Sequence, residues 1–256
     1  WRWSTLGIPF TGDPDAAQVK LLTGGAAEGL SEVELYDLLA GGLLIDEGAL
    51  RQIWERGLGE WTGVRPLDRV DACFERYEAH ALNAGESGDG RSPVWWGGWP
   101  VEVVADEVEV LSRLIRFDEQ RDFGPSATVY RNERGGRIVH LGLDPWYYIG
   151  IASKVGQIKR LVNWASGGTF PMEIIDPVPV APILRRTADG GRFVLLLQNS
   201  SLDEVARFRV RIRFAGTGVE TIDGHGIAYR RTSENEIEFE VGPIPGWGQH
   251  IVLGRN

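Results

Sequence analysis

The sequence predicts an α/β domain with a mainly parallel sheet, followed by a small antiparallel β-sandwich. Two observations indicate this fold class. Short apolar runs alternate with amphipathic helical segments as far as residue 168, and beyond it the hydrophobic period changes to two. With 256 residues the chain is long enough for two domains. We therefore divide it into residues 1–168 and residues 169–256, at a turn that contains two glycines.

The first domain opens with alternating strands and helices. The apolar run 19–22 predicts a buried strand that a Thr-Gly-Gly turn ends. Ser31 and Glu34 have the spacing of a capping box and predict the start of a helix. The next apolar run, 43–45, predicts a second strand, and Asp46 after it predicts the cap of a second helix.

The same order returns near the end of this domain. Residues 137–142 predict a strand and residues 156–166 a helix, so the β-α-β-α succession favours a mainly parallel sheet covered by helices. The segment 65–135 between them is less regular. There we expect an exposed strand at 70–77 and two strands within 101–115.

The second domain has the cleanest pattern in the chain. Residues 193–199 form an apolar run, and in 206–214 apolar residues alternate with arginines, whereas in 236–241 they alternate with glutamates. Glycine-containing turns at 188–191 and 223–224 fit a small antiparallel sandwich. The arginines and glutamates suit a cross-strand ladder on the wet face better than an anion site.

Composition excludes several classes of partner. The net charge of −9 disfavours nucleic acid and anionic membrane surfaces. No run approaches the roughly 18 consecutive apolar residues of a membrane span, and no secretory leader is recognisable, so we expect a cytoplasmic protein. A single cysteine excludes an internal disulfide framework, and four dispersed histidines form no local metal motif. We therefore expect no metal and no cofactor.

The sequence offers no catalytic residue that stands out. Cys73 lies within a predicted strand between Asp71 and Glu75, whose charges raise the pKa of a thiol, so we expect a structural cysteine. His140 lies in an apolar strand and is expected to be a satisfied core residue. A pair of carboxylates suited to glycoside hydrolysis cannot be identified from sequence, so an independent enzyme using such a pair or Cys73 stays an alternative.

Aromatic clusters are the best candidates for a binding surface. Trp95, Trp96 and Trp99 lie in a glycine-broken segment, and Trp146 and Tyr147 follow an Asp-Pro pair. Aromatic faces stack on sugar rings, so these residues are candidates for carbohydrate contact. The competing interpretation, which we favour, is that they pack against the sheet edge or form a subunit contact.

Several stretches also carry a family resemblance. They lie, in chain order, at 21–24, 38–46, 49–59, 63–64, 136–146, 163–168 and 243–248. Together they resemble the non-catalytic C-terminal region of large bacterial β-galactosidase-like glycoside hydrolases. The first part is similar to the trimerisation domain of that family, a flavodoxin-like fold with helices on both faces of its sheet. That domain is related to class I glutamine amidotransferases but lacks their catalytic cysteine. The second part resembles the β-sandwich that ends such enzymes.

The resemblance implies a role without chemistry. In that family the catalytic carboxylates belong to an N-terminal (β/α)8 barrel, and nothing in this sequence matches one. The resemblance therefore implies an assembly region that supports oligomerisation, for instance as a trimer, and lines a neighbouring active site. Its implied partners are further copies of the chain or a catalytic barrel preceding it. The alternative is a carbohydrate-binding module that uses Trp95, Trp96 and Trp99.

The first residues suggest an incomplete sheet. Residues 1–6 have the spacing of a helix tail, Gly7 suits a helix C-cap, and residues 8–10 then predict entry into a strand. Because a doubly wound sheet starts with a strand, we expect the first strand to be missing from this sequence. A second chain, a swapped strand or another peptide would fill the gap.

Overall fold

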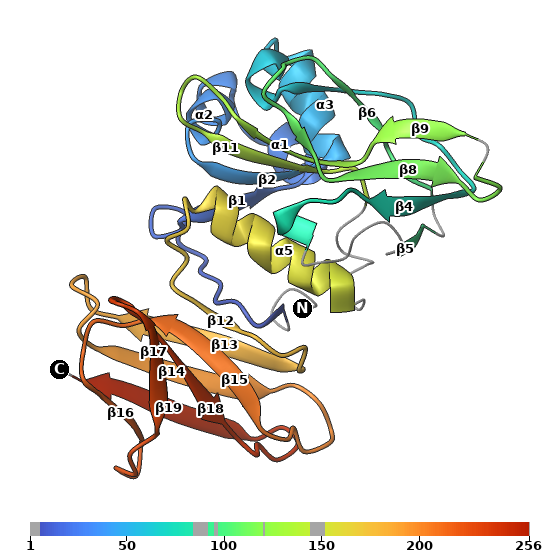
Figure 1. Ribbon diagram of the computed structural model, residues 1–256. Helices are drawn as coiled ribbons and strands as arrows, with labels where there is room; N and C mark the ends of the chain where they lie inside the picture. Colours follow the sequence, from blue (N-terminus) through green and yellow to red (C-terminus); the bar gives the residue numbers. More distant parts are fainter. Residues whose placement is uncertain (1–5, 84–91, 95–96, 120, 144–151, 256) are drawn as a thin grey trace. The chain divides into compact units, whose positions relative to one another are not determined.

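The computed structural model describes residues 6–83, 92–94, 97–119, 121–143 and 152–255. The chain divides into two compact units (Figure 1). We call Pro14–Thr169 the mixed unit, and Trp1–Asp13 together with Phe170–Asn256 the sandwich unit.

The prediction of a flavodoxin-like, mainly parallel sheet with helices on both faces is wrong. Strands hold 40% of the chain and helices 19%, and the described strands form five small sheets in which most pairings are antiparallel. The central sheet of the mixed unit has the order β1-β2-β11-β10-β7. Its strands are β1 (Val19–Leu22), β2 (Gly42–Asp46), β11 (Arg137–Leu141), β10 (Ala127–Arg131) and β7 (Glu109–Val110). Only the β1–β2 and β2–β11 pairs are parallel.

Two helices of the mixed unit begin where the sequence predicted, directly after Ser31 and Asp46. A third begins at Gly24, where a turn was predicted, and a fourth at Ala152, four residues before the predicted start at 156. They are α1 (Gly24–Glu28), α2 (Glu32–Leu38), α3 (Glu47–Glu55) and α5 (Ala152–Ala165), with short 3₁₀ helices at Gly59–Thr62 and Ala81–Asn83. The capping box of α2 is present, because the Glu34 amide donates to Ser31 Oγ and the Ser31 amide donates to the Glu34 carboxylate. The Asp46 carboxylate accepts from the Ala49 amide at 2.8 Å and so caps α3.

The segment between α3 and β11 explains the error in fold class. It contains no further strand-helix unit among its described residues, and the strand pairs that it forms are antiparallel. These are β3 (Val64–Pro66), β4 (Cys73–Tyr77), β5 (Ser92–Val94), β6 (Val101–Val103), β8 (Ser112–Arg116) and β9 (Asp122–Pro125). They build a two-stranded sheet, β3-β6, and a second sheet in the order β5-β4-β8-β9.

Two further expectations for this segment need correction. The strand expected at 70–77 is shorter and is not exposed, because Cys73, Phe74 and Tyr77 of β4 are buried. Strand β4 pairs on both sides, with β5 and β8, which removes its edge from water. The stretch 101–115 contains β6, β7 and most of β8 rather than two strands.

A tight hairpin joins β10 to β11 and depends on one buried side chain. The Asn132 amide nitrogen donates to the Leu39 and Trp61 carbonyls at 2.8 and 3.1 Å. Its oxygen accepts from the Arg134 and Gly136 amides at 3.1 and 2.9 Å. One side chain thus joins the hairpin to the residue that follows α2 and to the 3₁₀ helix Gly59–Thr62. All its hydrogen-bonding groups have partners.

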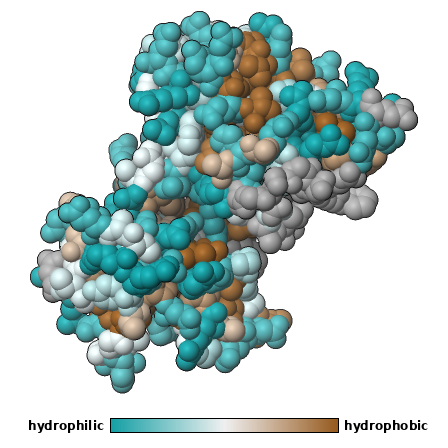
Figure 2. Space-filling model, in the orientation of Figure 1, coloured by the Kyte–Doolittle hydropathy of each residue, from teal (hydrophilic) through white to brown (hydrophobic). Residues whose placement is uncertain are grey.

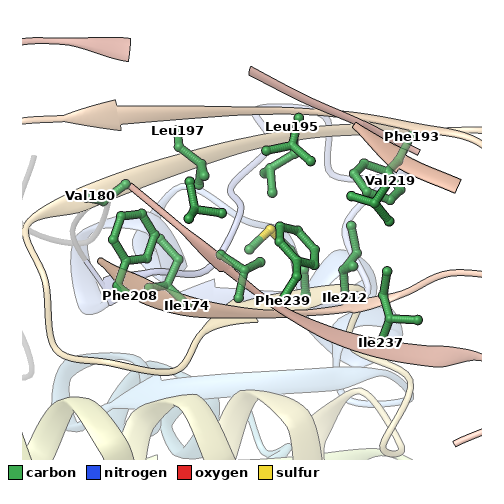
Figure 3. Close-up of a cluster of buried hydrophobic side chains, with 14 of the residues drawn as sticks. Ile174, Val180, Phe193, Leu195, Leu197, Phe208, Ile212, Val219, Ile237 and Phe239 are labelled. Atoms are coloured by element: carbon green, nitrogen blue, oxygen red, sulfur yellow. The ribbon is translucent and has the colours of Figure 1, made fainter. Parts of the chain in front are cut away.

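The sandwich unit confirms the predicted antiparallel β-sandwich. One sheet has the order β12-β15-β18-β17 and the other β13-β14-β19-β16. The strands are β12 (Met172–Ile174), β13 (Val180–Arg186), β14 (Phe193–Asn199), β15 (Phe208–Arg213), β16 (Gly218–Thr221), β17 (Tyr229–Ser233), β18 (Glu236–Val241) and β19 (Gln249–Arg255). Alternate side chains of both sheets, such as Leu195 and Phe239, point toward each other and form one apolar core (Figure 3).

The predicted ladder of charges is confirmed on the opposite face of one sheet. Strands β15 and β18 pair Arg209 with Glu240, and Arg211 with Glu238, in direct cross-strand register. Arg211 also lies 2.8 Å from the Glu173 carboxylate of β12. Each such pair on a wet face stabilises the sheet by only about 0.2–1 kcal/mol, so the ladder favours this register more than it adds stability.

The start of the chain differs from the expectation. Of the predicted helix tail, residues 1–5 lie outside the described residues. Gly7 does have a positive φ of 73°, but residues 8–10 form no strand and belong to the sandwich unit. The Gly7 carbonyl accepts from the Ile174 amide at 2.7 Å, at the edge of β12. That a strand is missing from the sheet of the mixed unit stays a prediction.

We predict that Asn132→Ala lowers the unfolding free energy of the mixed unit by roughly 2–3 kcal/mol, because it leaves buried backbone groups without partners. Urea denaturation followed by circular dichroism measures this. Asn163→Ala, at an exposed position of α5, is the control and should stay within about 0.5 kcal/mol. Equal effects of the two substitutions would contradict the role of Asn132.

Candidate functional site

Most of the aromatic residues singled out from the sequence cannot be placed. Trp95, Trp96, Trp146 and Tyr147 lie outside the described residues, so their role in carbohydrate or subunit contact stays a prediction. Trp99 is described and is half-buried.

The surroundings of Trp99 favour packing over sugar stacking. Its amide donates to the Gly142 carbonyl at 2.8 Å, which fixes its backbone beside the end of β11. The Arg69 guanidinium carbon lies 5.8 Å from the centre of its indole ring. A cation over an aromatic face is a favourable contact that a stacked sugar would have to displace.

Cys73 is a structural cysteine. It is the first residue of β4, with no exposed surface. Burial, and secondarily the Asp71 charge, raise the pKa of its thiol to about 11. At neutral pH it is therefore protonated and a poor nucleophile. The direction of this shift was predicted from the sequence, but its main cause is burial rather than the neighbouring acids.

The most extensive buried polar arrangement among the described residues of the mixed unit was not among the sites predicted from the sequence. Lys154, in the first turn of α5, directs its ammonium at the Glu75 carboxylate of β4, and Nζ lies 2.8 Å from both Oε1 and Oε2. The two side chains are 1% and 0% exposed. This is a fully buried ion pair between a helix and a strand.

Neutral side chains complete the coordination of the pair. Nζ of Lys154 also donates to Gln157 Oε1 at 2.7 Å, and the Ser112 hydroxyl donates to Glu75 Oε1 at 2.5 Å. The Gln157 amide nitrogen donates in turn to Asn83 Oδ1 at 2.7 Å. We call Glu75, Lys154, Gln157, Asn83 and Ser112 the buried network. Because a buried charge is costly unless it is paired and hydrogen-bonded, these contacts make the arrangement tolerable.

The geometry of the buried network suits support rather than catalysis. All three N–H groups of the Lys154 ammonium have acceptors, two on Glu75 and one on Gln157. Neither charge is open to solvent, so a substrate could reach them only if α5 moved away. The network therefore fixes the start of α5 against β4.

Sequence did contain a signal for this network. The 27 basic residues include only three lysines, and two of these, Lys154 and Lys159, are buried in α5. Lys154 is spaced by four from Ile158 and by seven from Leu161, which puts it on the apolar face of the helix. A lone lysine on an apolar face requires a buried acid, and Glu75 on the buried strand β4 supplies it.

His140 is buried, as expected, but it is not satisfied by the residues described. It lies in β11, with Thr128 and Ile45 as cross-strand neighbours. Neither ring nitrogen has a hydrogen-bond partner among those residues. Burial lowers the pKa of the imidazole to about 4; a Ser126 backbone group near the ring opposes this weakly without reaching hydrogen-bond geometry. The ring is therefore neutral at pH 7.

The described ranges contain no group of three histidine, cysteine, aspartate or glutamate side chains arranged to hold a metal ion. Within the same ranges, no helix combines the length and apolar character needed to cross a membrane.

Comparison with known proteins gives a likeness of fold. No family model matches the sequence, and no curated protein matches it. Among solved structures, the α-L-fucosidase isoenzyme 2 of Paenibacillus thiaminolyticus is similar with a TM-score of 0.59 and 13% identity, over 87% of this chain and 38% of that one. The β-galactosidase of Rahnella sp. R3 is similar with a TM-score of 0.50 and 14% identity, over 93% of this chain and 32% of that one. The β-galactosidase of Bacillus circulans sp. alkalophilus has a TM-score of 0.49 and 14% identity, over 93% of this chain and 32% of that one.

These comparisons show a shared fold and nothing finer. The chain has the architecture of a segment found in glycoside hydrolases, and it spans 38% and 32% of the length of the fucosidase and the Rahnella enzyme. At these identities the likeness concerns the fold and does not transfer any residue's role.

We predict that Lys154→Met is strongly destabilising, by about 3–5 kcal/mol, because the Glu75 carboxylate is left buried without its cation. The double variant Glu75→Gln/Lys154→Met should lose clearly less. A double-mutant cycle from urea denaturation measures the difference. Lys20→Met, at a half-buried position of β1, is the matched control, and an equal loss in Lys20→Met and Lys154→Met would contradict the prediction.

His140 predicts a pH dependence of stability. Its pKa is lowered from 6.5 to about 4 in the folded chain, so the unfolded chain binds the extra proton first as the pH falls. Above pH 6.5 the imidazole is neutral in both states, so it does not change the unfolding free energy. As the pH falls from 6.5 toward 4, the unfolding free energy decreases by up to about 3 kcal/mol. His140→Leu should flatten the unfolding free energy over that window, whereas His225→Gln, at an exposed turn, should not. An unchanged slope in His140→Leu would refute the assignment.

Proposed function

We propose that this chain is a non-catalytic region of a glycoside hydrolase and holds subunits of that enzyme together. The likeness of fold carries the proposal. Nearly all of this chain aligns with about a third of the length of two glycoside hydrolases, which is what an accessory region of a larger enzyme predicts. Sequence resemblance to the C-terminal region of β-galactosidase-like enzymes agrees with it.

The chemistry of the described residues supports a role outside catalysis. The only thiol is buried and protonated, and the buried ion pair has no free donor for a substrate. Most other carboxylates singled out here cap helices or face arginines across strands, as Asp46 and Glu238 do. Their surroundings need no catalytic explanation.

Exposed apolar side chains support the assembly part of the proposal. In the mixed unit Leu67, Val103 and Val104 are 37%, 39% and 41% exposed, and they lie on adjoining segments. Val103 pairs with β3, and the Leu67 amide donates to the Pro100 carbonyl just before β6. Figure 2 shows hydrophobic residues reaching the surface of this unit. An apolar surface of this kind is stabilised when a second protein surface covers it.

The alternative, a carbohydrate-binding module, has less support. It depends on three tryptophans, of which two are undescribed and the third has an arginine over its ring. No observation on the described residues favours it over subunit contact.

We predict that the purified chain forms a homo-oligomer at micromolar concentration, because association removes Val103 and Val104 from water. Light scattering coupled to size-exclusion chromatography measures the mass. Val104→Glu should shift the population toward monomer, whereas Val33→Glu, 69% exposed on α2, is the control and should not.

Two results would overturn the proposal. A strictly monomeric chain would contradict the assembly role. Hydrolysis of an aryl β-galactoside or aryl α-fucoside by the purified chain, abolished by substituting a single carboxylate, would contradict the non-catalytic role.

A further inference from the structure

The sandwich unit has a pocket rich in arginine at the end of one sheet. It has a volume of about 590 Å³ and is formed where the β13–β14 hairpin lies beside the last residues of β19. Its lining combines cationic and aliphatic side chains: Arg185, Arg186, Arg192, Arg255, Val194 and Leu253.

Strand register brings the two kinds of side chain onto one face. Arg185 of β13 pairs directly with Val194 of β14, and Val194 pairs with Leu253 of β19. Directly opposite residues of antiparallel strands point to the same side of the sheet. Phe193 and Leu195, on either side of Val194, are buried in the sandwich core, so this row faces outward. The result is an aliphatic floor with a guanidinium at its edge.

The arginines of this pocket are poorly compensated. None of the described residues that line it is acidic. Arg255 pairs with Glu220 at 2.5 Å, whereas Arg185 and Arg186 have no carboxylate partner among the residues described. Asp189 lies near Arg192, but its carboxylate already accepts from the Thr187 hydroxyl and the Gly191 amide within the turn.

Four arginines on or beside the sheet β12-β15-β18-β17 differ in this respect. Arg207, Arg209, Arg211 and Arg230 all pair with carboxylates. In a chain with a net charge of −9, a pocket with several unpaired guanidinium groups is a local exception. Guanidinium groups bind carboxylates and sulfates through paired hydrogen bonds, so an anion would relieve their mutual repulsion.

We propose that this pocket binds an acidic saccharide, a sugar carrying a carboxylate or a sulfate. The anionic group would contact Arg185 and Arg192, and the apolar C–H face of the ring would lie on Val194 and Leu253. The volume falls in the range of about 300–1,000 Å³ typical of small-molecule sites. The inference that the anion is carried by a sugar rests on the proposed function. The inference that the site prefers anions rests on the pocket alone.

Isothermal titration calorimetry with tetragalacturonate as the probe tests the proposal. We expect binding to the full chain that weakens as sodium chloride is raised, and no binding of the neutral tetrasaccharide of galactose. Arg185→Gln/Arg192→Gln should weaken binding at least tenfold. The control Arg207→Gln/Arg230→Gln removes the same charge from the other sheet and should leave the affinity unchanged.

The arms of the experiment separate the outcomes. Equal binding of the neutral tetrasaccharide, no binding of tetragalacturonate, or an equal loss in both double variants would overturn the proposal. Equally tight binding of sodium sulfate or of a short oligoaspartate would show a general anion or acidic-peptide site and would overturn the saccharide assignment. The proposed assembly role is judged separately, from oligomeric mass and aryl-glycoside hydrolysis, neither of which requires this pocket.

Discussion

The contact between the Glu75 carboxylate and the Lys154 ammonium is the constraint on which the mixed unit depends. Helix α5 buries Ile158 and Leu161 and packs on β2 and β11 of the central sheet. Its first turn reaches the other sheet through Lys154, which bonds to β4. An apolar helix face alone could pack in several positions along a sheet. A buried ion pair has one acceptable geometry, because any displacement leaves a charge unpaired in the interior. The pair thereby fixes the start of α5 on β4, while the rest of the helix packs on the central sheet.

The two units use charge in opposite ways. In the mixed unit the Glu75–Lys154 pair is buried and satisfied, so it determines structure. In the sandwich unit the charges are outside the core. One sheet balances arginines with glutamates along a ladder, and the other gathers arginines at a pocket where Arg185 and Arg186 have no carboxylate partner among the described residues. A balanced ladder has little left to offer a ligand. The pocket has guanidinium groups free to bind an anion. Within one small domain, arginine therefore has a structural role on one sheet and a proposed binding role on the other.

Local signals in the sequence were informative where the chemistry was local. The caps at Ser31 and Asp46, the strand Val19–Leu22 and the alternation in β15 each depend on residues a few positions apart, and each is present in the structure. The sheet order was not predictable in this way. Parallel strands β1 and β2 suggested that the pattern would continue, but β10 joins β11 through a hairpin held by Asn132, whose partners lie up to 93 positions away. The buried network was missed for the same reason, because Lys154 and Glu75 are 79 positions apart.

Native-state hydrogen exchange tests the central claim most directly. If the Glu75–Lys154 contact makes α5 part of one cooperative unit with both sheets, the slowest amides of α5, β2 and β4 should exchange with the same opening free energy. The Lys154→Met variant should lower all three together. Exchange of α5 at a much lower free energy than β2 and β4, or a loss confined to α5 in the variant, would contradict the account, because the helix would then open alone and the ion pair would not determine the fold.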